Sequence, residues 1–271
     1  TKRRQVMRRW INPARRQTNS DSDPLSGYGS RFGSEQLDPT SKPERVRQHF
    51  AKVARRYDLM NTLLSLGLHH IWKRRAVDLA GIRPGDRVLD LCGGTGDLVR
   101  LARESAEGEG VFAVCDFTRP MMEVGRDKSR KRREEVAWME GDAECLPVCD
   151  SGVEAVLLGF GIRNLTDPGR GIAEIYRVLR PGGRLMCLEF SRPLNPVFRA
   201  FYDLYSFSVM PLMGRLFAGS GQAYLRLAET IRMFPVAEEL SRLFREHGFQ
   251  DTKCLYFTNG VAVAHLARKP A

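Results

Sequence analysis

The sequence lacks any long hydrophobic run. No stretch approaches the roughly 20 consecutive apolar residues that a helix needs to cross a bilayer, so contact with a membrane is expected to be peripheral at most. Of the 271 residues, 42% are hydrophobic and 9% aromatic, which is enough to bury a sizeable core. This length suits one large α/β domain, with or without a modest insertion, because single cores extend to about 250 residues.

Paired cysteines are also missing. The six cysteines form no Cys-x-x-Cys pair and have no histidine pair nearby, so we expect no zinc and no other metal. Three of them fall in predicted core strands, and we interpret them as reduced thiols in a reducing compartment such as the cytoplasm. The five histidines include no obvious catalytic base, although His69 is placed to reach a site from a lid-like segment before it.

An apolar signal segment is absent from the N-terminal region. Residues 1–42 are rich in arginine and serine, show no sustained hydrophobic period, and are predicted to be a disordered basic tail. The formal net charge of +11 fits a solvated tail first and attraction to an anionic membrane surface second. Nucleic acid is not an expected partner, because no aromatic stacking platform accompanies the charge. The tail also overlaps transit peptides in composition, so organellar targeting stays open. A second basic cluster, residues 128–133, is expected at the exposed end of a helix.

The rest of the chain, residues 43–271, alternates apolar strands with helices. This pattern predicts an α/β fold with a doubly wound, mostly parallel sheet of seven strands covered on both faces. Two helical segments, 43–80 and 196–235, interrupt or precede the alternation and are predicted to cap the site. The turn at 258–260 indicates an antiparallel C-terminal hairpin. The expected strands are 87–91, 111–115, 136–139, 153–158, 184–189, 252–257 and 261–266.

A glycine-rich turn follows the first strand of this series, at residues 88–97 (VLDLCGGTGD). Gly93, Gly94 and Gly96 let the backbone approach a ligand beyond the carboxyl end of the strand. The third glycine of a dinucleotide fingerprint is missing, and Asp97 would repel a pyrophosphate at the helix N-terminus. Together with Asp90, Asp97 favours a ligand that carries positive charge. S-adenosylmethionine, with its sulfonium and ammonium groups, is therefore preferred over NAD.

Two further acids end the next two strands. Asp116 lies roughly 20 residues beyond the glycines, where a carboxylate can accept hydrogen bonds from both ribose hydroxyls. A helix-capping role is the alternative for this residue. Asp142 is placed to accept a hydrogen bond from the adenine amino group.

From Val46 onward the sequence resembles the ubiquinone/menaquinone biosynthesis C-methyltransferases, within the class I methyltransferases. The resemblance is carried by residues 49–58 (HFAKVARRYD), 60–61 (MN), 67–74 (GLHHIWKR), 159–167 (GFGIRNLTD), 176–183 (YRVLRPGG), 188–193 (LEFSRP) and 229–235 (ETIRMFP). The glycine loop and the RPGG turn are shared by many methyltransferases and indicate only the class. The YDxMN, FGxRN and LEFS segments are much more specific to this family.

The resemblance implies that Thr95, Asp116, Asp142 and Ala143 contact the methyl donor. A further donor contact, usually a serine, falls on Gly159 here, so this contact would have to come from backbone or water. A tyrosine that is common in the substrate cover is replaced by Arg226.

The implied acceptor, and hence the implied partner, is a reduced, prenylated quinone precursor: a demethylmenaquinol, a methoxy-benzoquinol of the ubiquinone route, or both. Arg163 is expected to stabilise the phenolate, because arginine stays charged. Asn164 is expected to position a water that removes the proton, and Tyr57 to order that water or bind an oxygen. The alternatives are a helix-capping turn for Arg163 and Asn164 and core packing for Tyr57.

Other readings remain open at this stage. The apolar segment 198–217 has three possible roles: a cover over a hydrophobic acceptor, a surface that docks on a bilayer, or an ordinary buried insertion. A class I methyltransferase that acts on RNA is the rival enzyme, but it predicts a catalytic cysteine or an Asn-Pro-Pro-Tyr motif after the fourth strand. A scaffold without catalysis predicts damage to the glycine loop, which is intact. The oligomeric state is not predicted.

Overall fold

The computed structural model describes residues 31–32, 35–36, 38 and 40–271. A seven-stranded sheet in the order β5-β4-β3-β6-β7-β9-β8 forms its centre. Every pairing in this sheet is parallel except the two that involve β9, which confirms the predicted α/β sheet with an antiparallel C-terminal hairpin. The strands are β3 (Arg87–Leu91), β4 (Val111–Asp116), β5 (Ala137–Glu140), β6 (Val153–Gly159), β7 (Leu179–Phe190), β8 (Gln250–Phe257) and β9 (Ala262–Arg268), and the turn η4 (Thr258–Gly260) joins the last two.

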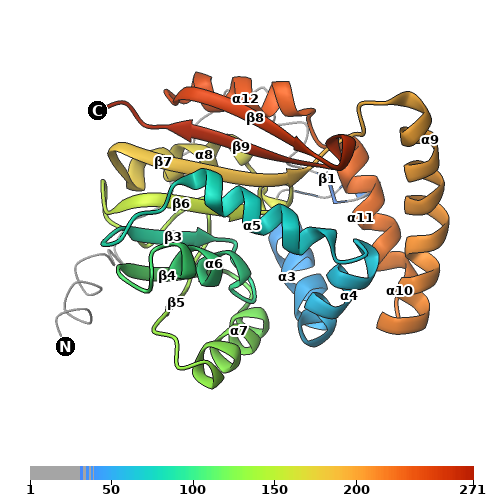
Figure 1. The fold of residues 1–271 in the computed structure, drawn as a ribbon. Coiled ribbons are helices and arrows are strands. Elements are labelled where there is room, and N and C mark those ends of the chain that lie inside the picture. Colours follow the sequence, from blue (N-terminus) through green and yellow to red (C-terminus); the bar gives the residue numbers. More distant parts are fainter. Residues whose placement is uncertain (1–30, 33–34, 37, 39) are drawn as a thin grey trace.

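Helices cover both faces of the sheet (Figure 1). One hydrophobic cluster joins α5 (Leu68–Ala80) and α6 (Asp97–Ser105) to the sheet. A second cluster joins α8 (Pro168–Val178) and α12 (Ala237–Glu246) to it. Successive residues of β3 alternate between the two clusters, which is the period of a strand that is buried on both sides.

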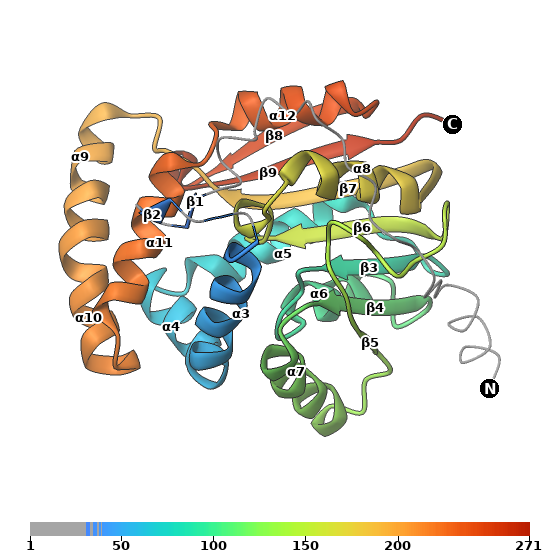
Figure 2. The same ribbon diagram turned by 180° about the vertical axis from the view of Figure 1, so that it is seen from behind.

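A group of helices, which we call the cap, lies beyond one end of the sheet in both views (Figures 1 and 2). It has a small hydrophobic core of its own, formed by Met60, Leu64, Met210 and Tyr224. Its elements are α3 (Lys42–Val53), the 3-10 turn η1 (Ala54–Arg56), α4 (Tyr57–Leu64), α9 (Pro196–Leu204), the π-helical turn η3 (Tyr205–Val209), α10 (Met210–Ala218) and α11 (Gly221–Met233).

The start of the described chain contributes to the cap. A short antiparallel pair, β1 (Arg31–Phe32) with β2 (Glu35–Gln36), precedes α3, and β1 contacts α3 and α11. The predicted disordered tail, residues 1–42, lies largely outside the described residues, and its disorder stays a prediction. None of the helices in the described ranges is long and apolar enough to span a bilayer.

The basic cluster at 128–133 departs from its prediction at its first residues. Lys128 is only partly exposed and forms an ion pair with Asp58 of the cap, and Ser129 is buried. The reason is that α7 (Arg119–Lys131) packs against α3 and η1, so that this end of the helix faces protein and not solvent.

One glycine of α7 makes room for an aromatic side chain next to the glycine loop. A Cβ added to Gly125 would lie 2.1 Å from the Trp138 ring of β5 and 3.0 Å from the Thr95 carbonyl oxygen. A real Cβ does not lie 2.1 Å from a ring carbon, so the Trp138 ring would have to move. Glycine is therefore required at this position by packing.

We predict that Gly125→Ala lowers the free energy of unfolding by about 1–3 kcal/mol, the usual cost of overpacking. A glycine-to-alanine change inside an unobstructed helix would instead raise it by up to about 1 kcal/mol. Urea unfolding of both proteins measures the difference. The double variant Gly125→Ala/Trp138→Leu is the control, because removing the ring should return part of the loss; a stabilising single substitution would contradict the packing argument.

Candidate active site

Two cavities meet at the carboxyl end of the sheet. The first, the strand-end cavity, is lined by the ends of β3, β4 and β6 and by the glycine loop. The second, the cap cavity, has a volume of about 260 Å³ and is enclosed mainly by the cap helices and by α5. Four residues line both: Phe50, Tyr57, Phe160 and Asn164. A group bound in one cavity therefore faces the other across these four side chains.

The glycine loop takes its shape from the buried carboxyl group of Asp90. This carboxyl is fully buried, and its Oδ2 accepts a 2.9 Å hydrogen bond from the Val99 amide of α6. A Cβ at Gly93 would lie 2.7 Å from the Asp90 Cγ, so only glycine fits above it. Gly94 and Gly96 turn the chain with φ of +54° and +80°, a region that glycine tolerates best.

The charges of the two aspartates near this loop differ from the sequence-based argument. Burial raises the pKa of Asp90 to about 8, although the Val99 amide favours its charged form. At neutral pH Asp90 is thus largely protonated when no cation lies beside it. Burial also disfavours a charged Asp97, but Lys73 and Lys128 outweigh burial and hold its pKa below the usual value. The Lys73 ammonium lies 2.7 Å from the Asp97 carboxylate, so Asp97 is not the free negative charge that we expected.

The acids at the ends of β4 and β5 both line the strand-end cavity, as predicted from their positions. Asp116 accepts hydrogen bonds from the amides of Gly94, at 2.9 Å, and Thr118, at 2.7 Å, and its burial raises its pKa. It therefore holds the loop and caps the next turn while facing the cavity. Asp142 accepts from the Glu144 amide at 2.9 Å.

Two small residues complete this wall. Ala143 and Gly159 line the same cavity. A Cβ at Gly159 would lie 2.7 Å from the Leu98 Cδ1, so a side chain at this position would require Leu98 to move.

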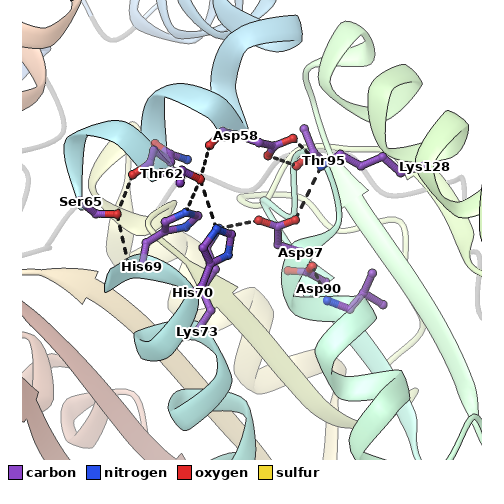
Figure 3. Close-up of polar contacts among 12 residues, drawn as sticks. Asp58, Thr62, Ser65, His69, His70, Lys73, Asp90, Thr95, Asp97 and Lys128 are labelled. Atoms are coloured by element: carbon purple, nitrogen blue, oxygen red, sulfur yellow. Dashed lines mark hydrogen bonds and ion pairs between the residues drawn. The ribbon is translucent and has the colours of Figure 1, made fainter. Parts of the chain in front are cut away.

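Thr95 connects the glycine loop to the cap. Its buried hydroxyl donates a 2.8 Å hydrogen bond to Asp58 Oδ1 of α4 (Figure 3). Asp58 directly follows Tyr57, which lines both cavities. Sequence reasoning missed Asp58, because nothing in the local pattern links residues that are 37 positions apart.

Arg163 and Asn164 lie on the 3-10 turn η2 (Ile162–Asn164) that follows β6, and both line the cap cavity. Arg163 Nη1 donates to the Phe160 carbonyl oxygen at 2.7 Å and to Glu189 Oε1 at 2.5 Å. Both members of this ion pair are buried. Burial raises the pKa of Glu189, which Arg163 partly opposes. The charge of Arg163 therefore has a buried counter-charge, which sequence reasoning did not find.

The walls of the cap cavity are otherwise mostly apolar and aromatic. Trp72, Phe190, Tyr202, Tyr205 and Tyr224 contribute rings from five different elements. The sequence signal for them was only the aromatic content of the cap segments, which does not say which faces point inward.

Two histidines also line the cap cavity. Burial first, and neighbouring cations second, lower the pKa of His49 to about 4 and that of His69 to about 3. Both imidazoles are therefore neutral near pH 7. His69 Nε2 lies 3.1 Å from the Thr62 hydroxyl, and its placement at the cavity agrees with the expectation that it reaches the site.

Two charged residues of the cap, Arg226 and Lys42, have partners elsewhere in the chain. Arg226 lines the cap cavity and pairs with Glu35 at 3.0 Å. Lys42 is fully buried, and its ammonium donates a 2.6 Å hydrogen bond to the Leu165 carbonyl oxygen. Burial lowers the pKa of Lys42 to about 8, while Glu144 opposes the shift. Among the residues that the structure describes, no group of three histidine, cysteine or acidic side chains is placed to hold a metal ion.

Comparison with known proteins gives a family match over most of the chain. The sequence profile described as the ubiE/COQ5 methyltransferase family matches residues 39–269. The protein named ubiquinone/menaquinone biosynthesis C-methyltransferase UbiE from Legionella pneumophila (strain Corby) is 39% identical over 242 residues, covering 89% of this chain and 97% of that one. The protein of the same name from Ectopseudomonas mendocina is 41% identical over 243 residues, covering 89% and 95%.

Solved structures of lower identity share the fold. A SAM-dependent methyltransferase from Thermotoga maritima superposes with a TM-score of 0.56 at 20% identity, covering 82% of this chain and 98% of that one. A SAM-dependent methyltransferase from Aquifex aeolicus gives a TM-score of 0.53 at 14% identity, covering 72% and 88%.

The raised pKa of Asp90 predicts how the stability of the ligand-free protein depends on pH. Between its ordinary value of 3.8 and about 8, the native state holds a proton that the unfolded chain has lost. The contribution of Asp90 to the free energy of unfolding thus falls by about 1.4 kcal/mol for each pH unit gained between about pH 5 and pH 7. Asp90→Asn removes this dependence, so its stability relative to the natural protein should rise with that slope in urea unfolding. Parallel pH curves for the two proteins would show that Asp90 is ionised throughout.

Proposed function

The chain belongs to the ubiE/COQ5 methyltransferase family, and we propose that one of its two cavities binds the methyl donor and the other the methyl acceptor. The protein is an S-adenosylmethionine-dependent C-methyltransferase of ubiquinone and menaquinone biosynthesis. In this proposal S-adenosylmethionine occupies the strand-end cavity and the ring of the quinone precursor occupies the cap cavity. The observation that carries the proposal is that the two cavities share the walls formed by Phe50, Tyr57, Phe160 and Asn164.

The residues of the strand-end cavity suit S-adenosylmethionine along its whole length. Asp142 and Ala143 at the end of β5 would hold the adenine, and Asp116 at the end of β4 the ribose. The amino-acid end would then lie over the glycine loop, near Thr95 and Asp90. Asp90 Oδ1 is buried with no hydrogen-bond partner among the described residues, and an incoming ammonium would stabilise its charged form.

The cap cavity suits a prenylated ring. Its wall is mostly apolar, and Asn164 and Tyr57, which also line the strand-end cavity, give it polar groups on the donor side. S-adenosylmethionine supplies an electrophilic methyl group. The chain's task is to align the acceptor carbon in line with the breaking bond, and alignment of this kind can supply several kcal/mol.

A ring carbon becomes a good nucleophile only when an adjacent hydroxyl loses its proton. In our proposal Arg163 stabilises the resulting phenolate, and Glu189 keeps the guanidinium oriented and prevents it from being a lone buried cation. The low pKa values of His49 and His69 make them weak bases. We therefore assign removal of the hydroxyl proton to a water held by Asn164 and Tyr57, which passes it to solvent, and not to an imidazole. After methyl transfer the ring carbon loses its own hydrogen as a proton by the same route, which restores the aromatic ring.

The assay of this function supplies labelled S-adenosylmethionine and, separately, a short-chain demethylmenaquinol and a short-chain methoxy-benzoquinol, both kept reduced. Label should appear on the ring carbon of one or both acceptors, which identifies the pathway. Asn164→Ala should lower kcat by about 10²-fold, the usual share of proton transfer, and change donor affinity by less than about twofold.

The control for this assay is Gln222→Ala, an exposed substitution on the cap that should leave kcat unchanged. If the donor binds but neither quinol is methylated, while RNA is, the acceptor proposal is wrong. If Asn164→Ala weakens donor binding and leaves kcat intact, the assignment of Asn164 is wrong.

A second part of the proposal concerns how a prenylated acceptor reaches the cap cavity. One side of α9 and α10 faces this cavity through Tyr202 and Met210. The outer side of α9–η3–α10 is exposed and apolar, with Phe201 68% and Leu212 57% exposed. The segment is thus not an ordinary buried insertion. Because exposed Arg215 of α10 lies one turn from Leu212, on the same side of the helix, we propose that this surface rests on an anionic bilayer.

Vesicle sedimentation tests this contact. The protein should pellet with vesicles that contain anionic lipid more than with zwitterionic ones, because arginines near a charged surface each add about 1 kcal/mol. Phe201→Glu/Leu212→Glu should lower the bound fraction at least about fivefold. Leu79→Glu, on an exposed leucine of α5, is the matched control and should have little effect. Equal losses for both variants, or no binding by the natural protein, would overturn the proposed membrane surface.

A further inference from the structure

Asp58 of α4 bridges the cap and the glycine loop through both of its carboxylate oxygens (Figure 3). Oδ1 accepts the 2.8 Å hydrogen bond from the Thr95 hydroxyl, and Oδ2 pairs with the Lys128 ammonium of α7. The Lys128 ammonium also lies 3.7 Å from Asp97, which Lys73 holds at 2.7 Å. The glycine loop and α7, which come from separate parts of the chain, therefore both contact this carboxylate of α4.

This arrangement decides which way the Thr95 hydroxyl bonds. A threonine hydroxyl has one proton to donate and two lone pairs that accept. An ionised carboxylate is an acceptor only, so the proton of Thr95 must point toward Asp58. What the hydroxyl then offers to the strand-end cavity is its oxygen, which recognises a hydrogen-bond donor and rejects a second acceptor.

We propose that Asp58 is a positioning residue for donor recognition: by fixing the Thr95 hydroxyl as an acceptor toward the strand-end cavity, it selects the ammonium of the methyl donor. This inference rests on the proposed function, which places the amino-acid end of S-adenosylmethionine over the glycine loop. It adds a residue of the acceptor-side cap to the recognition of the donor, since Asp58 belongs to the helix that also carries Tyr57.

The experiment compares two ligands by isothermal titration calorimetry. S-adenosylhomocysteine carries the ammonium, whereas 5′-methylthioadenosine has the same nucleoside but lacks the amino-acid end. Asp58→Ala should weaken binding of S-adenosylhomocysteine about tenfold, the size of one charge-assisted hydrogen bond. It should change binding of 5′-methylthioadenosine by less than about twofold, which also reports that the cavity is folded.

Three further variants separate positioning from a general effect on the fold. Thr95→Val should weaken S-adenosylhomocysteine to the same extent, and Asp58→Ala added to Thr95→Val should cause no further loss. Asp58→Asn should restore most of the affinity, because its amide oxygen still accepts from Thr95. Lys128→Ala is the matched control: it removes the ion pair but leaves the Thr95 hydrogen bond, so the ratio of the two affinities should stay within about threefold of the natural protein.

Several outcomes would overturn the inference. Additive losses in the double variant, or equal weakening of both ligands by Asp58→Ala, would mean that Asp58 only supports the fold. If Asp58→Ala does not fold, Asp58→Asn and the Thr95 variants still decide, because an Asp58→Asn protein that behaves like Thr95→Val contradicts the acceptor role. A natural protein that binds neither ligand would instead refute the proposed function itself.

Discussion

The burial of one carboxyl group, that of Asp90, is the constraint on which the rest of the site depends. It joins the end of β3 to the first turn of α6 through the Val99 amide and leaves room for nothing larger than glycine above it. The glycine loop shaped in this way lines the strand-end cavity and places the Thr95 hydroxyl next to Asp58 of the cap. A buried carboxyl that has no contact with water is costly to ionise. Asp90 is therefore expected to ionise only when a positively charged group binds beside it.

The cap has a small hydrophobic core of its own, and polar contacts join it to the loops at the strand ends. Met60, Leu64, Met210 and Tyr224 pack the cap internally, apart from the two clusters of the sheet. The Lys42 ammonium on the Leu165 carbonyl and the Thr95 hydroxyl on Asp58 fasten the cap to the loops at the strand ends. Both cavities therefore have one wall on each body, and a small displacement of the cap changes both at once.

Much of the fold was predictable because its signals are local. Short apolar strands, the glycine turn after β3 and the turn before β9 each lie within a few residues, and each was placed correctly. The aspartates at strand ends were also found, because parallel strands bring their carboxyl ends to one edge. The pairing of Arg163 with Glu189 joins residues 26 apart, and that of Lys42 with Leu165 joins residues 123 apart. No periodicity carries such information, and the pairing of Asp97 with Lys73 was missed because Lys73 lies on another helix.

Because of the π-helical turn η3, the packing of the cap depends on the exact number of residues between Tyr205 and Met210. Its wider turn holds Tyr205 where its hydroxyl donates to the Leu64 carbonyl oxygen, at 2.8 Å, and the next residue of the cap core is Met210. Removing one residue from this turn would rotate everything after it by about 100° about the helix axis. Met210 would leave the cap core while exposed leucines turned inward. Insertions and deletions among natural variants should therefore avoid this helix and collect in the loops at its ends, because the spacing from Tyr205 to Met210 fixes the width of the cap cavity.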